Sequence, residues 1–82
     1  MNTKLNPPFS DLSKEVVVGG FYEHYKKLSY KVLAIARHSE TLEELVVYQA
    51  LYGEYGVWVR PLKMFTENVT MNDIEQPRFK LI

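Results

Sequence analysis

The residues with the most potential for chemistry in this sequence are two histidines and the polar side chains near them. His38 stands in a run of five polar residues, 37–41, between two apolar stretches, and His24 lies in an earlier tyrosine-rich stretch. With Glu40, these histidines supply three side chains of the types that bind a catalytic metal or act as general acid and base. The same polar run also has the composition of a turn between two strands.

A hydrolase with a serine nucleophile would need a base within hydrogen-bond distance of Ser39. The adjacent His38 is a poor partner, because neighbouring side chains of an extended chain point to opposite faces. His24 could serve Ser39 from a neighbouring strand, with Glu40 or Glu23 orienting it. No local spacing of the His-x-x-x-His kind supports a metal site. A small hydrolase or metal-dependent enzyme using His24, His38 and Glu40 is therefore the alternative to a non-catalytic protein, for which we expect no metal and no cofactor.

Composition narrows the class of protein. A chain of 82 residues forms one domain with one modest core. Ten basic residues balance ten acidic ones, which does not favour sequence-independent binding of nucleic acid, and the basic stretch from Lys26 to Arg37 is interpreted as a solvated strand face and its turn. The absence of cysteine excludes disulfides and thiolate nucleophiles. No stretch has the length of a signal peptide core or a membrane span, so we expect a cytoplasmic protein without a membrane partner.

The chain divides into an arm, residues 1–15, and a single β-domain, residues 16–82. Pro7 and Pro8 exclude regular strand pairing in the arm, and the string SDLSKE could form one helical turn capped by Ser10 or Asp11. Two consecutive glycines at 19–20 predict a bend where the backbone changes direction.

Alternation of side chains predicts the first two strands of the domain. In residues 20–26, Tyr22 and His24 share one side. Strict alternation over residues 30–38 assigns one face to Tyr30, Val32, Ala34, Ala36 and His38, and the other to Lys31, Leu33, Ile35 and Arg37. Both faces are largely apolar in the middle of this segment, which predicts a central strand covered on both sides.

The segment 42–52 has two interpretations. A helix capped by Ser39 would align Leu42, Leu45, Val46 and Gln49 in one stripe. The β-branched and aromatic residues of this segment favour a strand, and a hairpin with the preceding segment is our preferred interpretation.

The residue pattern in the last third of the chain predicts one more strand, a short helix and a closing strand. VWVRP is a strand ended by Pro61, Leu62 and Phe65 have helical spacing after it, and PRFKLI reads as an edge strand. The expected fold is mostly β: a small five-stranded, SH3-like, partly open barrel with one short helix after the fourth strand.

Several strings in this order together resemble one family: GFYEHYK, YKVLAIARHSET, LVVYQALYG, VWVRPLKMF and PRF. They are similar to the small bacterial family named domain of unknown function 1653, from about Gly20 to Phe79. The resemblance implies a compact, mostly-β domain that is often a stand-alone protein. It also points to a set of signature positions: Tyr22, His24, Lys26, Arg37, His38, Ser39, Glu40, Tyr48, Trp58, Arg60 and Phe65.

A recognition groove is the functional prediction that these residues support best. Arginines beside aromatic rings commonly bind carboxylate or phosphate groups. We expect the groove to be built from Tyr22, His24, Arg37, His38, Glu40, Tyr48, Trp58 and Arg60. The protein would then be a binding or interaction module for a protein, a peptide or a nucleotide-like ligand, with nucleic acid less favoured. A third hypothesis is a structural subunit that forms a homodimer through an exposed aromatic surface.

Overall fold

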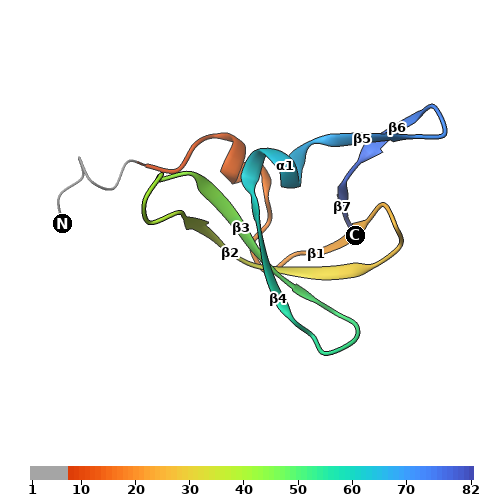
Figure 1. Cartoon of the computed structure of the whole chain (residues 1–82), viewed down its shortest axis with the longest axis horizontal. Helices are drawn as coiled ribbons and strands as arrows, with labels where there is room; N and C mark the ends of the chain where they lie inside the picture. Colours follow the sequence, from red (N-terminus) through yellow and green to blue (C-terminus); the bar gives the residue numbers. More distant parts are fainter. Residues whose placement is uncertain (1–7) are drawn as a thin grey trace.

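The computed structural model describes residues 8–82, and the chain in this range is mostly β (Figure 1). No helix in this range is long and apolar enough to cross a membrane. The elements are, in order, a 3-10 helix η1 (Leu12–Glu15), β1 (Phe21–His24), β2 (Ser29–Arg37), β3 (Glu44–Ala50), β4 (Val57–Pro61), α1 (Leu62–Thr66), β5 (Asn68–Met71), β6 (Ile74–Pro77) and β7 (Phe79–Leu81).

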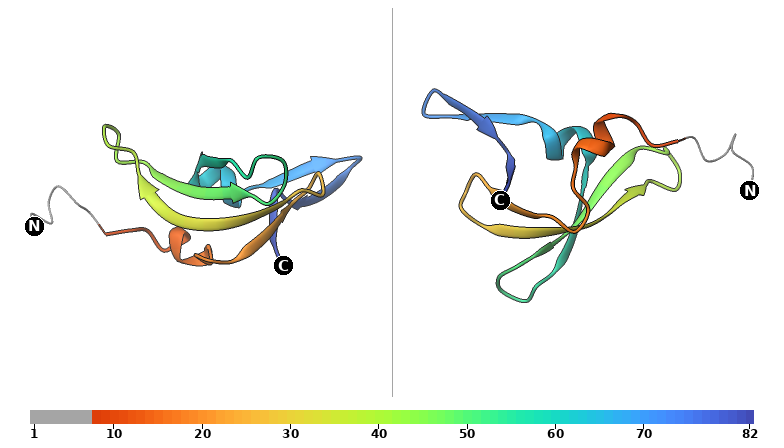
Figure 2. Two further views of the ribbon diagram at one scale, coloured as in Figure 1. Left: turned by 90° about the horizontal axis from the view of Figure 1, so that it is seen from below. Right: turned by 180° about the vertical axis from the view of Figure 1, so that it is seen from behind.

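Five of these strands form one antiparallel sheet in the order β4-β3-β2-β1-β7. The sheet is strongly bent, as the edge-on view in Figure 2 shows. Its two edges, β4 and β7, do not pair with each other, so the sheet is not closed into a barrel. The short helix does follow the fourth strand, as predicted, and β7 is the predicted edge strand.

The segment 44–50 is a strand, so the helical interpretation of this region is wrong. Val46, Tyr48 and Ala50 alternate into the core, while the residues between them are only partly buried. A helix over the same residues would have turned Tyr48 away from the face shared by Val46 and Ala50. The β-branched and aromatic residues suit the pleated, half-buried surface that they occupy.

A β-bulge in β2 overturns the predicted assignment of its faces. Val32 lies opposite Tyr48, but the pairing shifts before Ala34, and Ile35 lies opposite the buried Val46. The extra residue is Leu33, and it moves Ile35 to the core side and Ala34 to the other side. Strict alternation cannot reveal such an insertion, because it assumes one residue for each partner along the whole strand.

The outer face of the sheet is not covered by the described chain, contrary to the expectation for the central strand. Leu33 in β2 is 38% exposed, and Phe21, Val57 and Val59 are 50–60% exposed. The core lies on the inner face alone, against α1 and η1.

The core is built around stacked aromatic rings. Phe65 of α1 and Phe79 of β7 are parallel, with centroids 4.2 Å apart. Tyr48 packs against both rings at 5.3–5.6 Å, and Tyr22 meets Phe65 edge-on at 5.4 Å. Such pairs add stabilisation beyond the area that they bury. Because these residues come from β1, β3, α1 and β7, the cluster joins the two ends of the domain.

The described part of the predicted arm, residues 8–15, contacts the domain; Pro7 lies outside the described residues. Leu12 packs against the core, and Ser13 is buried at 5% exposure. The Ser10 hydroxyl accepts a hydrogen bond from the Ser13 amide, whereas Asp11, the N-cap residue of η1, makes no capping hydrogen bond with its side chain. The Ser10 amide in turn donates to the Glu44 carboxylate at 2.9 Å.

A second, two-stranded sheet was not predicted. β5 and β6 form a hairpin that projects from the body of the domain (Figure 1). Its two turn residues, Asn72 and Asp73, both have positive φ, at 53° and 62°. Asn and Asp tolerate this conformation, and it matches the twist of the flanking strands.

The packing of Leu12 against the core generates the first prediction. We expect Leu12→Ala to lower the free energy of unfolding by about 1–2 kcal/mol, because the removed methyl groups are partly buried. The matched control is Leu28→Ala, since Leu28 is 38% exposed in the β1–β2 turn, and it should cost less than about 0.5 kcal/mol. Urea denaturation measures both values, and equal losses would show that η1 is not part of the packed domain.

Candidate functional site

The predicted site residues separate into groups along β2. His24 ends β1 and lies beside the first residues of β2, whereas Arg37, His38 and Glu40 lie at its other end. Nine residues of strand between them correspond to roughly 25–30 Å. His24 therefore does not converge with His38 and Glu40 in one chain, as the hydrolase or metal-enzyme alternative requires. Within residues 8–82, no three His, Cys, Asp or Glu side chains are grouped to hold a metal ion.

His38 is a capping residue of the β2–β3 turn. Its Nδ1 accepts hydrogen bonds from the amides of Glu40 and Thr41, at 3.1 and 3.2 Å. The backbone of His38 also donates to Glu43 and accepts from Leu42. Glu40 itself is exposed at the tip of the turn. The side chain of His38, and not that of Ser39, thus caps this turn.

Arg37 also has contacts that belong to this turn. Its Nη1 donates to the Leu42 carbonyl at 2.8 Å, and its guanidinium lies 4.8 Å from the ring centre of Phe9. The pKa of Glu44 is lowered, chiefly by the hydrogen bond from the Ser10 amide and less by the charge of Arg37. These contacts tie the turn to the segment before η1, and they account for Arg37 without a ligand.

Only one of the three predicted groove aromatics is accessible. Tyr22 and Tyr48 are buried at 6% and 5% exposure, and the Tyr22 hydroxyl accepts a hydrogen bond from the Val17 amide. Trp58 lies opposite Tyr48 on the neighbouring strand, but it is 58% exposed. Tyr48 and Trp58 were expected to form the floor of the groove, but only the indole of Trp58 lies at the surface.

Arg60 is a partly buried cation held by aromatic groups. Its Nε donates to the Tyr48 hydroxyl at 3.3 Å, and its guanidinium carbon lies 5.8 Å from the ring centre of Phe79. Among the residues that the structure describes, no carboxylate lies within ion-pair distance of Arg60. Arg78, by contrast, pairs with Glu67 at 2.7 Å.

His24 belongs to the same region, on the core side of β1. Its ring meets Phe79 at 4.9 Å and Tyr30 at 6.4 Å, in both cases edge-on. Burial lowers the pKa of His24 from its ordinary value, and the positive charges of Arg60, Arg78 and Lys26 lower it further. Nδ1 accepts a hydrogen bond from the Lys26 amide at 3.2 Å, so in the neutral ring Nε2 carries the proton.

A pair of tyrosine hydroxyls extends this region. Tyr30 packs edge-on against Tyr48 at 5.2 Å, and its hydroxyl is hydrogen-bonded to that of Tyr52. Burial and this hydrogen bond raise the pKa of Tyr30, so its hydroxyl stays protonated. Sequence reasoning missed Tyr30 and Tyr52 as site residues, because their role depends on pairing between distant segments. We name Arg60, His24, Tyr30, Tyr48 and Tyr52 the Arg60 patch.

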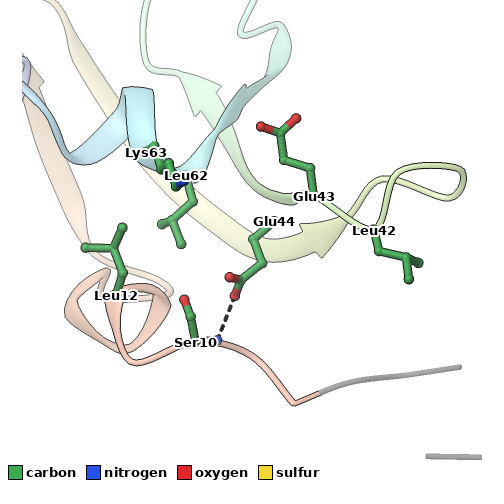
Figure 3. A pocket seen from close by; sticks show the side chains of 7 residues that line it. All are labelled: Ser10, Leu12, Leu42, Glu43, Glu44, Leu62 and Lys63. Atoms are coloured by element: carbon green, nitrogen blue, oxygen red, sulfur yellow. Dashed lines mark hydrogen bonds between the residues drawn. The ribbon is translucent and has the colours of Figure 1, made fainter. Parts of the chain in front are cut away.

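The largest cavity described lies elsewhere, where the arm, the start of β3 and the start of α1 meet (Figure 3). It has a volume of about 370 Å³, and three leucines form its apolar surface. The Glu44 side chain turns toward the Ser10 amide at its edge (Figure 3). Its lining residues are Ser10, Leu12, Leu42, Glu43, Glu44, Leu62 and Lys63. None of the eight predicted site residues is among them, since this cavity forms only through tertiary packing.

A smaller cavity of about 220 Å³ adjoins the Arg60 patch through His24. It lies between the β1–β2 turn and the strands β6 and β7, and its lining residues are Glu23, His24, Tyr25, Lys27, Gln76, Pro77 and Lys80. Two cavities thus contain a predicted site residue: His24 lines this one, and Tyr22 lines another of about 270 Å³.

The contacts of His38 generate the second prediction. His38→Ala should lower the free energy of unfolding by about 1 kcal/mol, since two turn amides lose their acceptor. Ser39→Ala is the matched control, because Ser39 is exposed and makes no hydrogen bond within the described residues; it should change stability by less than about 0.5 kcal/mol. Thermal denaturation checks both, and the reverse order of effects would return the capping role to Ser39.

Comparisons with known proteins agree with this architecture. Residues 20–81 match the family described as Protein of unknown function (DUF1653). The structure is similar to the crystal structure of a DUF1653 protein from Bordetella bronchiseptica, with 37% sequence identity, a TM-score of 0.74, and coverage of 83% of this chain and 90% of that chain. A comparison with curated proteins finds no match. With the family match spanning the whole sheet and the predicted resemblance confirmed, this chain belongs to the DUF1653 family.

Proposed function

We propose that the protein is a non-catalytic binding module that holds an anionic group of its ligand at the Arg60 patch. The anionic group would be a carboxylate of a peptide or a phosphate of a nucleotide-like molecule. The observation that carries the proposal is the state of Arg60: a partly buried guanidinium, positioned by the Tyr48 hydroxyl and the Phe79 ring, without a carboxylate within ion-pair distance among the described residues.

The hydrogen-bonding capacity of the patch supports this proposal. Only the Nε–H of Arg60 is used by the hydrogen bond to Tyr48, so the planar pair of N–H groups at the end of the side chain is available for an oxyanion. Tyr48 accepts in that bond and keeps its own proton to donate. In the Tyr30–Tyr52 pair one hydroxyl is the donor, and the other retains a proton to give.

The electrostatics of the patch also favour an anion. Burial is the first cause of the lowered pKa of His24, and the positive charges of Arg60, Arg78 and Lys26 lower it further. A bound anion would offset that repulsion, and it would take the place of the missing counter-ion of Arg60. Trp58, two residues before Arg60 on β4, adds an exposed ring on which an aromatic part of the ligand could stack.

The topology is consistent with an SH3-like binding scaffold. Four consecutive antiparallel strands are followed by a short helix, the β5–β6 hairpin and a last strand that pairs with the first, and this order supports a partly open, SH3-like scaffold. The Arg60 patch draws on the four strands β1 to β4 and on the loop after β3. Recognition surfaces on loops and edges of a rigid β-scaffold are a common arrangement.

Removal of Arg60 tests the proposal. Arg60→Ala should abolish saturable binding of pyrophosphate or citrate, measured by isothermal titration calorimetry and by shifts of the His24 ring signals in NMR spectra. The melting temperature should stay within a few degrees of wild type, because no partner carboxylate is left unpaired. Lys14→Ala is the control, since Lys14 is an exposed cation of η1 and lies outside the Arg60 patch and its adjoining cavity.

Two results would contradict the proposal. Unchanged binding in Arg60→Ala would place the anion elsewhere. A large loss of stability in the same variant would show that Arg60 is a structural residue of the core and not a ligand-binding one.

Acidification tests the role of His24. Its pKa is lowered by folding, so below the ordinary value of 6.5 the unfolded chain binds the proton more readily, and the folded state loses stability as pH falls. We expect the melting temperature of wild type to decline between pH 7 and pH 5 more than that of His24→Gln. Anion affinity should rise over the same range in wild type alone, because protonation adds a positive charge to the patch. Parallel pH profiles of the two proteins would rule out this role.

A further inference from the structure

The outer edge of β4 is open to a further strand. β4 is an edge of the main sheet, and its residues Val57, Trp58 and Val59 are 58–60% exposed. No other segment of residues 8–82 pairs with that side. Edge strands of monomeric proteins are usually protected by charges, bulges or covering loops. β4 carries one charged side chain, Arg60, and ends in Pro61; its other three residues, Val57, Trp58 and Val59, pair well in sheets.

Backbone geometry shows which groups face this edge. The Ala50 amide donates to the Gly56 carbonyl, just before β4 begins. Because hydrogen-bonded pairs alternate along an antiparallel ladder, the pairs Tyr48–Trp58 and Val46–Arg60 are also hydrogen-bonded. The amides and carbonyls of the residues between them, Val57 and Val59, therefore point away from β3.

Pro61, the last residue of β4, directs its backbone nitrogen and carbonyl away from β3, as Val57 and Val59 do. Its nitrogen faces the free edge, where a missing N–H does not break the pairing with Leu45. The edge thus offers two complete donor and acceptor sets, from Val57 and Val59, followed by one further carbonyl.

We infer that a second copy of this chain pairs with β4, antiparallel, about a two-fold axis at Val59. In this register Val59 lies opposite Val59 of the second copy, and Val57 lies opposite Pro61. Trp58 lies opposite Arg60, so each guanidinium meets an indole ring and a cation–π contact forms on both sides of the axis. The pairing is isologous, as closed dimers require.

Neighbouring registers lack this complementarity. A two-fold axis at Arg60 would place two guanidinium groups opposite each other, which is repulsive. An axis at Trp58 would pair Arg60 with Gly56 and carry the rest of the strand into the turn that precedes β4. The register at Val59 alone joins apolar to apolar residues and each cation to an aromatic ring.

The dimer would also complete the Arg60 patch, because Trp58 of the second copy lies beside Arg60. The inference does not rest on the proposed function, since it is tested without any ligand. A pair of five-residue strands buries little surface, at the lower end of specific interfaces, so the dimer should form in the micromolar range.

Sedimentation equilibrium from low micromolar to millimolar protein provides the test. The wild-type mass should rise from 9.6 kDa toward twice that value. Val59→Pro removes an N–H that faces the free edge and not β3, so this variant should stay monomeric with a melting temperature close to wild type. Val59→Thr keeps the N–H and the β-branched shape, and it should dimerise as wild type does.

Cross-linking gives a second measurement that does not depend on the proline variant folding. The chain contains no cysteine, so Val59→Cys introduces a single thiol next to its own copy, at a Cα spacing that a disulfide can bridge. Mild oxidation should convert this variant to a linked dimer. Leu33→Cys, exposed on β2 away from the edge, should remain unlinked.

Three results would overturn the inference. They are a wild-type protein that is monomeric at all concentrations, a folded Val59→Pro variant that still dimerises, and cross-linking through Leu33→Cys instead of Val59→Cys. The last result would assign the contact to the exposed outer face of the sheet.

Discussion

The rest of the structure depends on one constraint, the burial of tyrosines in a small aromatic core. A tyrosine ring is stabilised by burial, but its hydroxyl must keep a hydrogen-bond partner. Tyr22 accepts from the Val17 backbone, Tyr48 from Arg60, and Tyr30 pairs with Tyr52. Among the described residues, no buried side-chain nitrogen or oxygen lacks a partner. The tyrosines therefore place a rim of polar groups around the core.

The stacked pair of Phe65 and Phe79 decides where that rim is placed. Phe79 brings β7 against β1, and Phe65 brings α1 over the same rings. Arg60, two residues before the helix, then lies over Phe79, and the ring of His24 also meets Phe79. The closing strand thus brings together the imidazole of β1 and the guanidinium of β4, two strands that lie apart in the sheet. The same contacts around Phe79 therefore pack the core and form the Arg60 patch.

The cations of the domain differ in how their charges are compensated. Arg78 pairs with Glu67, and Arg37 serves the β2–β3 turn through the Leu42 carbonyl. Arg60 has only neutral groups among its described contacts. Local departures from the compensation seen elsewhere in a fold are expected at functional positions. That contrast, together with the exposed Trp58 and the open edge of β4, directs attention to one side of the molecule for binding and assembly.

The sequence by itself determined the five strands of the main sheet, the short helix after Pro61 and the family, because alternation, β-branched residues and proline act over a few neighbouring positions. It also identified Arg60 and His24 as candidates. Only the tertiary structure decided which of the candidate site residues lie close together. The bulge at Leu33 reset the faces of β2, and the imidazole of His38 turned back to cap its own turn. Local patterns report the preferences of the backbone, whereas register and the approach of side chains from distant strands depend on pairings that only the folded chain makes.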